Sequence, residues 1–522
     1  ALVKERNRRV RQRGYAVLAG GLVLLISLLV IAAAAPWWAQ ALTAIGALLV
    51  LAKLGTDADR PLVQAATVVP RARRLTADVV ERAFVAAKLA SEREPISFPA
   101  PIVRDGAGWR AVIDLPYSTT AEQALRKREQ IAAGLDLDES MVWPERIRGT
   151  AGSARRLGLW VADEDPFAKP SGSWPLAQRG QCDLFRPAPF GQDQRGRDVP
   201  VQLMFTSVLV GAIPRMGKTY AARLLALAGA LDLSCAQHIY DGKGGQDWRM
   251  FAGIAHRIGF GARDDVVLAL LADLRDLRED MDRRYDQLAA LPAELVPESK
   301  ITRDVASRPG LGLHPVQVVI DEFQRFSEHR EYGEEIVELL IDLAKVGPAV
   351  GIMLVLATQK PDATSIPTRL RDVIGTRFAG KVMTWQSSEN VLGAGTYGAG
   401  YDASKFQRSH KGTGILIGAD DSGAVEEAST VRTYLADGQD AVRVCARARA
   451  LREAAGRLTG MAVGEVPMPP ADRHEVLRDI LGIWPLDEER MWSAEIVERL
   501  AGVDSRYEGW TADTLAATVK PL

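Results

Sequence analysis

The stretch Ser207-Val-Leu-Val-Gly-Ala-Ile-Pro-Arg-Met-Gly-Lys-Thr219 decides the fold of this chain. We interpret it as the pattern Gly-x-x-x-x-Gly-Lys-Ser/Thr, with Gly211 as the first glycine, after an apolar strand and before a helix from Tyr220 to Ala230. Glycines between a strand and a helix let backbone N–H groups surround phosphates at the positive end of the helix dipole. The stretch therefore predicts a P-loop in an α/β domain.

The loop also predicts what each residue does with a nucleotide. Lys218 would reach the β- and γ-phosphates of ATP, and the Thr219 hydroxyl would ligate Mg²⁺. The predicted nucleotide contacts are ten consecutive residues: Gly211, Ala212, Ile213, Pro214, Arg215, Met216, Gly217, Lys218, Thr219 and Tyr220. The alternative is a chance Gly-Lys-Thr loop without a ligand.

A second motif argues against that alternative. Val316-Gln-Val-Val-Ile-Asp321-Glu322 is an apolar strand that ends in two acids. The Asp321 carboxylate suits the Mg²⁺ that accompanies the phosphates. Glu322 is then placed to polarise a water for attack on the γ-phosphate. A strand that simply ends in a polar turn fits two adjacent acids less well.

Two further strand ends carry polar groups. The strand 352–356 runs into Ala357-Thr358-Gln359, and Gln359 could sense the γ-phosphate, with an ordinary surface glutamine as the alternative. Asp241-Gly-Lys-Gly-Gly245 ends another strand in a glycine-rich turn. Ligands of open α/β sheets bind at this carboxyl edge.

Taken together, five motifs resemble the FtsK/SpoIIIE family of DNA-translocating ATPases over about residues 186–440. They are GAIPRMGKT (211–219), YDGKGG (240–245), VVIDEF (318–323), LATQKPDATSIPTRLR (356–371) and GTRFAGKV (375–382). The loop residues Pro214 and Arg215, two membrane spans and a short linker look more like TraB-like transfer proteins of actinobacterial plasmids and integrative elements. They also look somewhat like clostridial TcpA-type coupling proteins.

The resemblance implies a RecA-like motor that works as a ring, most simply a hexamer, and pumps double-stranded DNA with ATP and Mg²⁺. In such rings a neighbouring subunit supplies an arginine to the γ-phosphate. Arg377 matches the family position best. Arg369 and Arg371 are competitors, and each could equally be a surface or DNA-contacting residue.

The N-terminal part predicts a membrane anchor. Residues 15–35 carry no charge, and a second uncharged run, 36–52, follows a Pro-Trp-Trp break. A basic tail precedes them, so the positive-inside rule places both ends and the motor in the cytoplasm, in a multi-pass protein of the cell membrane. A signal peptide is the alternative, but its apolar region would be shorter and no second run would follow. Because the chain opens with Ala1, we expect residues upstream.

The rest of the chain predicts smaller units. Thr119-x-x-Glu122 has the spacing of a capping box, between strands at 109–115 and 157–162. Helices at 472–483, after Ser493 and after Thr511 suggest a helix-turn-helix or winged-helix module that binds DNA and continues beyond Leu522; a protein-docking module is the alternative.

The predicted organisation is a basic tail (1–14), a transmembrane hairpin (15–52), a linker with an amphipathic helix (53–100), a small α/β domain (101–175), the motor (176–445), a linker (446–470) and the C-terminal module (471–522).

Composition excludes some functions. With 522 residues and a net charge of −1, the chain cannot bind nucleic acid through overall basicity. Three cysteines and six histidines exclude a disulfide framework and disfavour a structural zinc site. We therefore expect a membrane-anchored hexameric ATPase that translocates double-stranded DNA in conjugative transfer. The alternatives are a chromosome-segregation translocase, a type VII-like protein-export ATPase, which a single P-loop disfavours, and a nucleotide-regulated scaffold, which the intact site residues disfavour.

Overall fold

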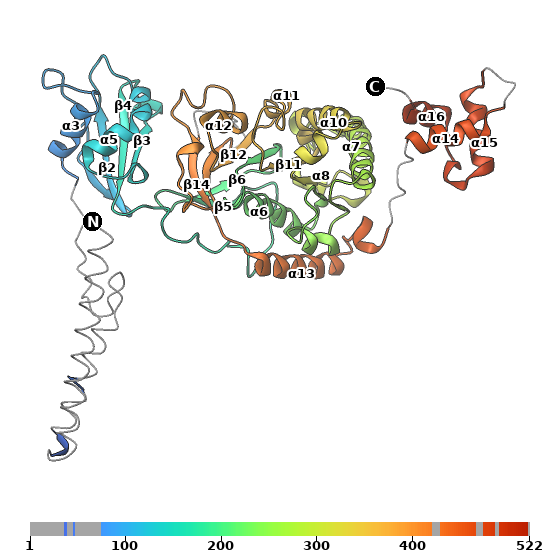
Figure 1. The fold of residues 1–522 in the computed structure, drawn as a ribbon, viewed down its shortest axis with the longest axis horizontal. Helices are drawn as coiled ribbons and strands as arrows, with labels where there is room; N and C mark the ends of the chain where they lie inside the picture. Colours follow the sequence, from blue (N-terminus) through green and yellow to red (C-terminus); the bar gives the residue numbers. More distant parts are fainter. Residues whose placement is uncertain are drawn as a thin grey trace, which may run out of the picture. The chain divides into compact units, whose positions relative to one another are not determined.

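The computed structural model describes residues 36–38, 45–46, 75–419, 428–465, 473–485 and 490–519 (Figure 1). The chain divides into two units, 1–73 and 74–522, and everything below concerns the second. The predicted hairpin at 15–52 lies outside the described residues, apart from positions 36–38 and 45–46. Among the described helices, none has both the length and the apolar character needed to cross a bilayer.

The motor domain is built on a ten-stranded sheet with the order β6-β5-β14-β13-β12-β7-β11-β10-β8-β9. The run from β12 to β9 is parallel, and the other strands add to it in antiparallel fashion. The parallel strands are β7 (Val208–Gly211), β8 (Ala236–Asp241), β9 (Arg257–Phe260), β10 (Val316–Asp321), β11 (Ile352–Thr358) and β12 (Thr376–Gly380). The antiparallel strands are β5 (Ala188–Asp193), β6 (Asp198–Val201), β13 (Thr413–Ile417) and β14 (Ser429–Thr433).

Helices cover the sheet from both sides (Figure 1). Every residue of β7, β10 and β11 is buried, as expected for central parallel strands made of Val, Ile and Leu. Helix α6 packs against α13, and α10 packs against α7. The helices of this domain are α6 (Lys218–Leu231), α7 (Asp264–Ala290), α8 (Arg303–Ala306), α9 (Gln324–Ser327), α10 (Gly333–Val346), α11 (Thr368–Arg371), α12 (Trp385–Leu392) and α13 (Gly438–Ala454).

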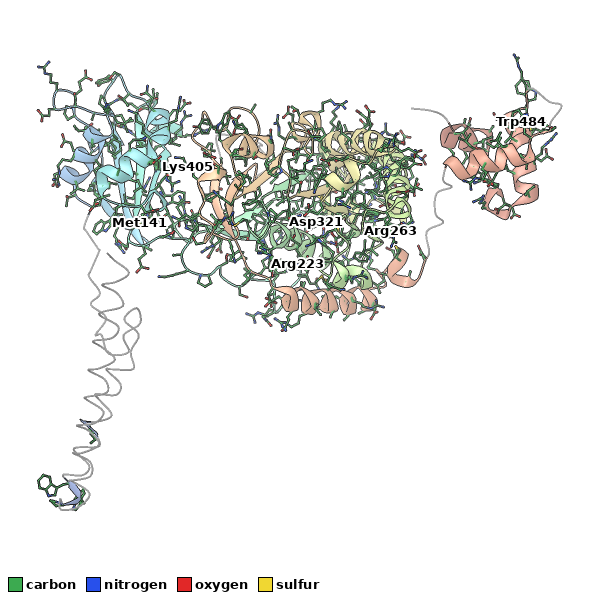
Figure 2. The ribbon with its side chains drawn as sticks, viewed as in Figure 1. Met141, Arg223, Arg263, Asp321, Lys405 and Trp484 are labelled. Atoms are coloured by element: carbon green, nitrogen blue, oxygen red, sulfur yellow. The ribbon has the colours of Figure 1, made fainter. Side chains whose placement is uncertain are left out.

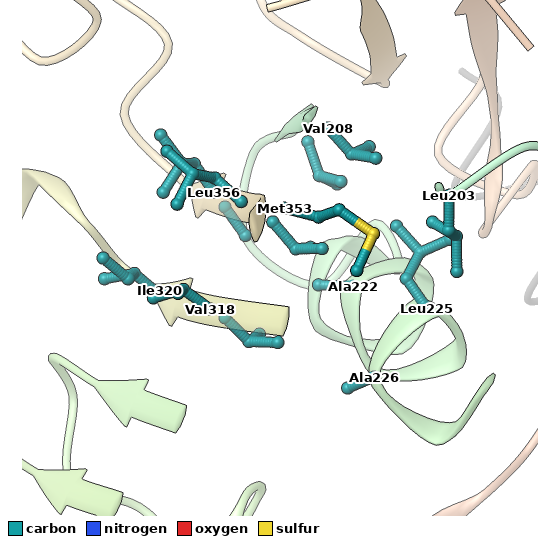
Figure 3. Close-up of a cluster of buried hydrophobic side chains, with 14 of the residues drawn as sticks. Leu203, Val208, Ala222, Leu225, Ala226, Val318, Ile320, Met353 and Leu356 are labelled. Atoms are coloured by element: carbon teal, nitrogen blue, oxygen red, sulfur yellow. The ribbon is translucent and has the colours of Figure 1, made fainter. Parts of the chain in front are cut away.

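The core beneath the P-loop helix holds α6 against the sheet. Figure 3 shows apolar side chains of β10 and β11 facing small and branched side chains of α6. The labelled members are Leu203, Val208, Ala222, Leu225, Ala226, Val318, Ile320, Met353 and Leu356, and all are almost fully buried. The alanines of α6 let the helix approach the strands closely, so its first turn is held firmly at the edge of the sheet.

Strand order brings the motifs together. β11 lies between the P-loop strand β7 and the acid strand β10, and β8 lies on the far side of β10. In register, Ala357 pairs with Val210 on one side and with Asp321 on the other, and Asp321 pairs with Asp241. All four strands therefore end at the same level. This explains why motifs far apart in the chain form one site.

The small α/β domain has a separate core. Its antiparallel sheet has the order β1-β2-β4-β3, and the predicted strands are confirmed as β2 and β4, which pair with each other. Helix α3, from the amphipathic segment that the sequence placed in the linker, packs into the same core through Val80 and Phe84. The elements are α3 (Ala77–Ala86), β1 (Val103–Asp105), β2 (Gly108–Asp114), α4 (Ala121–Arg126), α5 (Arg128–Leu135), β3 (Val142–Arg146) and β4 (Arg156–Ala162).

The predicted capping box is wrong by one residue. Thr120, not Thr119, is the N-cap of α4: its side chain accepts a hydrogen bond from the Gln123 N–H at 3.3 Å, and the Gln123 side chain accepts from the Thr120 N–H at 3.0 Å. Both threonines satisfy the spacing rule. A tertiary hydrogen bond from the Ala121 N–H to the Ala154 carbonyl is formed where the helix starts, and the sequence pattern does not contain it.

The C-terminal segment forms three helices around a shared core: α14 (Arg473–Ile483), α15 (Ser493–Val503) and α16 (Ala512–Val519). Leu500, Tyr507 and Leu515 are buried in it. The predicted N-cap Ser493 is instead the first helical residue of α15, after Trp492. Thr511 behaves as expected, since its hydroxyl accepts a hydrogen bond from the Thr514 N–H at 3.1 Å. A helix-turn-helix role for these helices stays a prediction.

Candidate active site

The phosphate loop joins β7 to α6 and needs glycine at its close approaches. Gly217 has φ 98°, and a Cβ there would lie 2.9 Å from the Gly412 backbone. Five residues separate Gly211 from Gly217, so the pattern's first position is Ala212, and our assignment of that position to Gly211 was wrong. The methyl group of Ala212 is accommodated because Gly380, on β12, has no side chain; a Cβ there would approach it to 2.9 Å.

The predicted loop contacts differ in exposure. The side chains of Ala212 and Met216 are buried, whereas those of Pro214, Arg215 and Tyr220 are exposed. The Ile213 N–H donates to the Lys381 carbonyl at 2.9 Å, which fastens the loop to the end of β12. The backbone N–H groups at the start of α6 form the part of the loop suited to an anion.

Four predicted residues meet at the start of α6. The Lys218 ammonium is 3% exposed and donates to a carboxylate oxygen of Asp321 and, at 2.7 Å, to Oε1 of Glu322. The Thr219 hydroxyl donates to Oδ2 of Asp321 at 3.3 Å. A buried ammonium is costly unless it is paired, and two carboxylates satisfy it here. The structure therefore assembles the cation, the hydroxyl and both acids that the sequence predicted.

Asp321 is held in place by Trp248, which the sequence analysis missed. The indole N–H of this fully buried tryptophan donates to Oδ2 of Asp321 at 2.9 Å. Its position explains the contact, because Trp248 follows the turn at the end of β8, the strand beside β10. Figure 2 labels Asp321 within the motor domain. A tryptophan three residues after the motif ending at Gly245 was the available signal.

Glu322 is held through its backbone and its side chain. Its φ of 54° lies in the left-handed region, rare for a residue with a side chain and often found at functional sites. Oε2 accepts hydrogen bonds from Nε2 of Gln324 at 2.7 Å and from the Gln359 N–H at 3.2 Å. Burial raises the pKa of Glu322, but the Lys218 charge and then these hydrogen bonds outweigh it and hold the pKa below its ordinary value. Glu322 is therefore ionised at neutral pH, as a base must be.

The backbone N–H of Gln359 donates to Glu322, and sensing of the γ-phosphate by the Gln359 side chain stays a prediction. Asp241 anchors the glycine-rich turn, because its carboxylate accepts the N–H groups of Lys243 and Gly245, each at 3.0 Å. Burial, partly offset by the Lys243 N–H, raises the pKa of Asp241, and the nearby Asp321 adds to this.

The three candidate arginines lie elsewhere in the domain. Arg369 is exposed and pairs with Glu338 at 2.6 Å, and the buried Arg371 pairs with Asp372 at 2.7 Å. Arg377 is half-buried against Gly393, and its Nε has no hydrogen-bond partner in the described part of the chain. Burial lowers the pKa of Arg377. Within the described residues, none of the three bonds to Lys218, Asp321 or Glu322.

The donors fit a magnesium ion shared with a nucleotide. Thr219 and Asp321 offer a hydroxyl and a carboxylate 3.3 Å apart, which are hard oxygen ligands of the kind that Mg²⁺ takes. Mg²⁺ on phosphates needs only one or two protein ligands. Across the described ranges, no group of three or more His, Cys, Asp or Glu could hold a metal by itself. When bound, Mg²⁺ would neutralise charge on the phosphates.

Comparisons with known proteins find similarity among solved structures. No family model matches the chain, and no curated protein does. Among solved structures, the pCW3 conjugation coupling protein TcpA, determined with ATPγS, matches with a TM-score of 0.45 and 16% identity over 72% of this chain and 99% of its own. This neighbour is an FtsK/SpoIIIE-type ATPase, which is consistent with the family that the motifs resemble.

Type VII secretion ATPases are also among the solved structures that match. The cytoplasmic domain of EccC from Thermomonospora curvata matches with a TM-score of 0.40 and 19% identity, over 55% of this chain and 33% of that one. EssC (ATPases 2 and 3) from Geobacillus thermodenitrificans matches with 0.44 and 16%, over 56% and 54%. The chain thus spans about a third of the first structure and half of the second.

Proposed function

We propose that this chain is a membrane-anchored ATPase that assembles as a hexamer and moves double-stranded DNA during conjugative transfer of a plasmid or integrative element. The single observation that carries the ATPase part is the buried cluster in which Lys218 contacts both Asp321 and Glu322, with Thr219 on Asp321. These are the groups that phosphoryl transfer requires: a cation for the phosphates, two metal ligands and a base.

Each group has a chemical task in hydrolysis. Lys218 stabilises the charge that develops on the β- and γ-phosphates, and Thr219 and Asp321 would hold Mg²⁺. Glu322 takes a proton from the attacking water, and its lowered pKa keeps the carboxylate ionised so that it can do so. Arg377 of a neighbouring subunit supplies a further positive charge next to the γ-phosphate. Gln359 senses the γ-phosphate and signals its loss after hydrolysis.

The DNA and membrane parts of the proposal come from the sequence. The motif set resembles DNA translocases, and the uncharged runs at 15–52 predict a hairpin that keeps the motor in the cytoplasm. Because the net charge is −1, contacts to DNA phosphates must come from local groups lining a ring. The three-helix C-terminal module then selects the DNA.

The test is ATP turnover by the full chain in detergent micelles, with long double-stranded DNA, single-stranded DNA or no DNA. We expect double-stranded DNA to stimulate turnover most, and added salt to weaken the stimulation because phosphate contacts are screened. Turnover indifferent to DNA would contradict the DNA part and favour a protein-export ATPase. Binding of ATP without multiple turnover would leave only a nucleotide-regulated scaffold.

A further inference from the structure

Gln324 is a buried residue whose side chain hydrogen-bonds to Glu322, the proposed base. It occupies the first position of α9, two residues after Glu322, and is 9% exposed. Its Nε2 donates to Oε2 of Glu322 at 2.7 Å. An ionised carboxylate can only accept hydrogen bonds, so this contact fixes which end of the amide is nitrogen and which is oxygen. The orientation of the Gln324 amide therefore follows from the chemistry of its partner.

The other end of the amide is unused. Oε1 of Gln324 is buried and has no donor among the described residues. Buried acceptors are nearly always satisfied, so one left open at a functional site calls for a ligand. Oε1 and Nε2 are bonded to the same carbon, which places Oε1 beside the Glu322 carboxylate. A small donor held there would touch both residues.

The two oxygens of Glu322 have different surroundings. Oε2 is held by Gln324 and by the Gln359 N–H, whereas Oε1 contacts Lys218 at 2.7 Å. When ATP phosphates bind Lys218 instead, Oε1 of Glu322 would lose this contact, while Oε2 would keep its two hydrogen bonds. One oxygen of the carboxylate is thus anchored and the other can receive a proton.

We propose that Gln324 acts with Glu322 as a catalytic pair that orients the attacking water: Gln324 Oε1 accepts a hydrogen bond from one water proton while Glu322 Oε1 takes the other proton. The water oxygen bonds to the γ-phosphorus, the bond from that phosphorus to the bridging oxygen breaks, and ADP leaves with the electron pair. This inference rests on the proposed ATPase function.

The test compares Gln324→Leu, which keeps the bulk and loses both the donor to Glu322 and the acceptor proposed for the water, with Gln324→Glu, which loses the donor. Gln202→Leu is the matched control, because it removes one amide contact, to the Leu184 carbonyl, at a half-buried position between β6 and β7. We expect both Gln324 variants to lower kcat about 10- to 100-fold, since part of the general-base contribution is lost. The ATP affinity, measured with a fluorescent analogue, should change by no more than about twofold.

The outcomes distinguish failure of this inference from failure of the proposed ATPase function. No turnover by the unaltered chain refutes the proposed ATPase and this inference with it. Turnover by the unaltered chain, with an unchanged kcat in Gln324→Leu, refutes only the inference. A Gln324 variant that loses ATP binding together with turnover also refutes it, because the residue would then be a structural support of the loop.

Discussion

The carboxyl edge of β10 and the segment from α11 to β12 both carry residues that the sequence assigned to catalysis, yet they differ in completeness. At the edge of β10, Lys218, Asp321 and Glu322 contact one another within a single chain. Within the described residues, Arg377 of the other segment contacts none of these three, and its buried Nε has no hydrogen-bond partner. The difference teaches that one chain brings the predicted cation, metal ligands and base together and keeps Arg377 apart from them. The role of Arg377 at a neighbouring subunit stays a prediction.

The largest expected effect on ATP turnover comes from removing Lys218, the cation at the carboxyl edge of β10. Lys218→Ala should abolish ATP turnover and greatly weaken ATP binding, because the β- and γ-phosphates lose the buried ammonium at the start of α6. It also leaves the adjacent acids Asp321 and Glu322 without the cation that both contact. Radiolabelled phosphate release and binding of a fluorescent ATP analogue measure the two losses. Near-normal turnover in this variant would remove the P-loop assignment.

The second prediction tests Arg377, in the segment from α11 to β12. Arg377→Ala should lower turnover about 10³-fold or more while ATP still binds, as expected for loss of an arginine that acts between subunits. Mixing Arg377→Ala with Glu322→Gln should restore part of the turnover, because some mixed interfaces combine an intact Glu322 with an intact Arg377. No recovery at any mixing ratio would point to Arg369, Arg371 or a site completed within one chain.

The third prediction isolates the base. Glu322→Gln keeps the size of the side chain and loses its basicity, so turnover should fall about 10²- to 10³-fold with ATP binding retained. The variant should accumulate as an ATP-bound complex on DNA, measurable by co-sedimentation with a long duplex. A rate equal to that of the unaltered chain would place the base elsewhere.

A smaller effect is expected at the tryptophan that the sequence analysis missed. Trp248→Phe removes the indole N–H from Asp321 and keeps most of the buried apolar bulk. Because such hydrogen bonds orient metal ligands, the Mg²⁺ concentration for half-maximal turnover should rise about tenfold. Trp174→Phe is the matched control: Trp174 is equally buried, but its indole N–H donates to the Pro189 carbonyl. Equal responses of the two variants would show that Trp248 acts only through stability.

The smallest effect on turnover should follow deletion of 471–522. The three C-terminal helices share their own core and contribute none of the described contacts of the site. Turnover stimulated by any long duplex should remain, while preference for a particular DNA site, found by selection from random sequences, should disappear. Loss of turnover would mean that the module belongs to the motor, and absence of any preference in the full chain would make it a docking element.

Much of the site could be predicted because its rules are local. Gly217 at positive φ, a lysine at the start of a helix and two acids at the end of a buried strand each depend on a few consecutive residues. The same rules failed where two neighbours satisfied them equally, as at Thr119 and Thr120, and at Gly211, where counting shows that Ala212 holds the first position of the pattern.

By itself, the sequence determined the P-loop, the acid pair and the parallel α/β fold, because strands and helix starts follow from short-range preferences and hydrophobic pattern. Only the tertiary structure decided which groups meet across the chain. Trp248 reaches Asp321 because β8 lies beside β10, the Gln359 N–H reaches Glu322 because β11 lies between β7 and β10, and Arg377 packs against Gly393 away from both acids. The physical reason is that strand order and register set these distances, and both emerge from packing of the whole sheet.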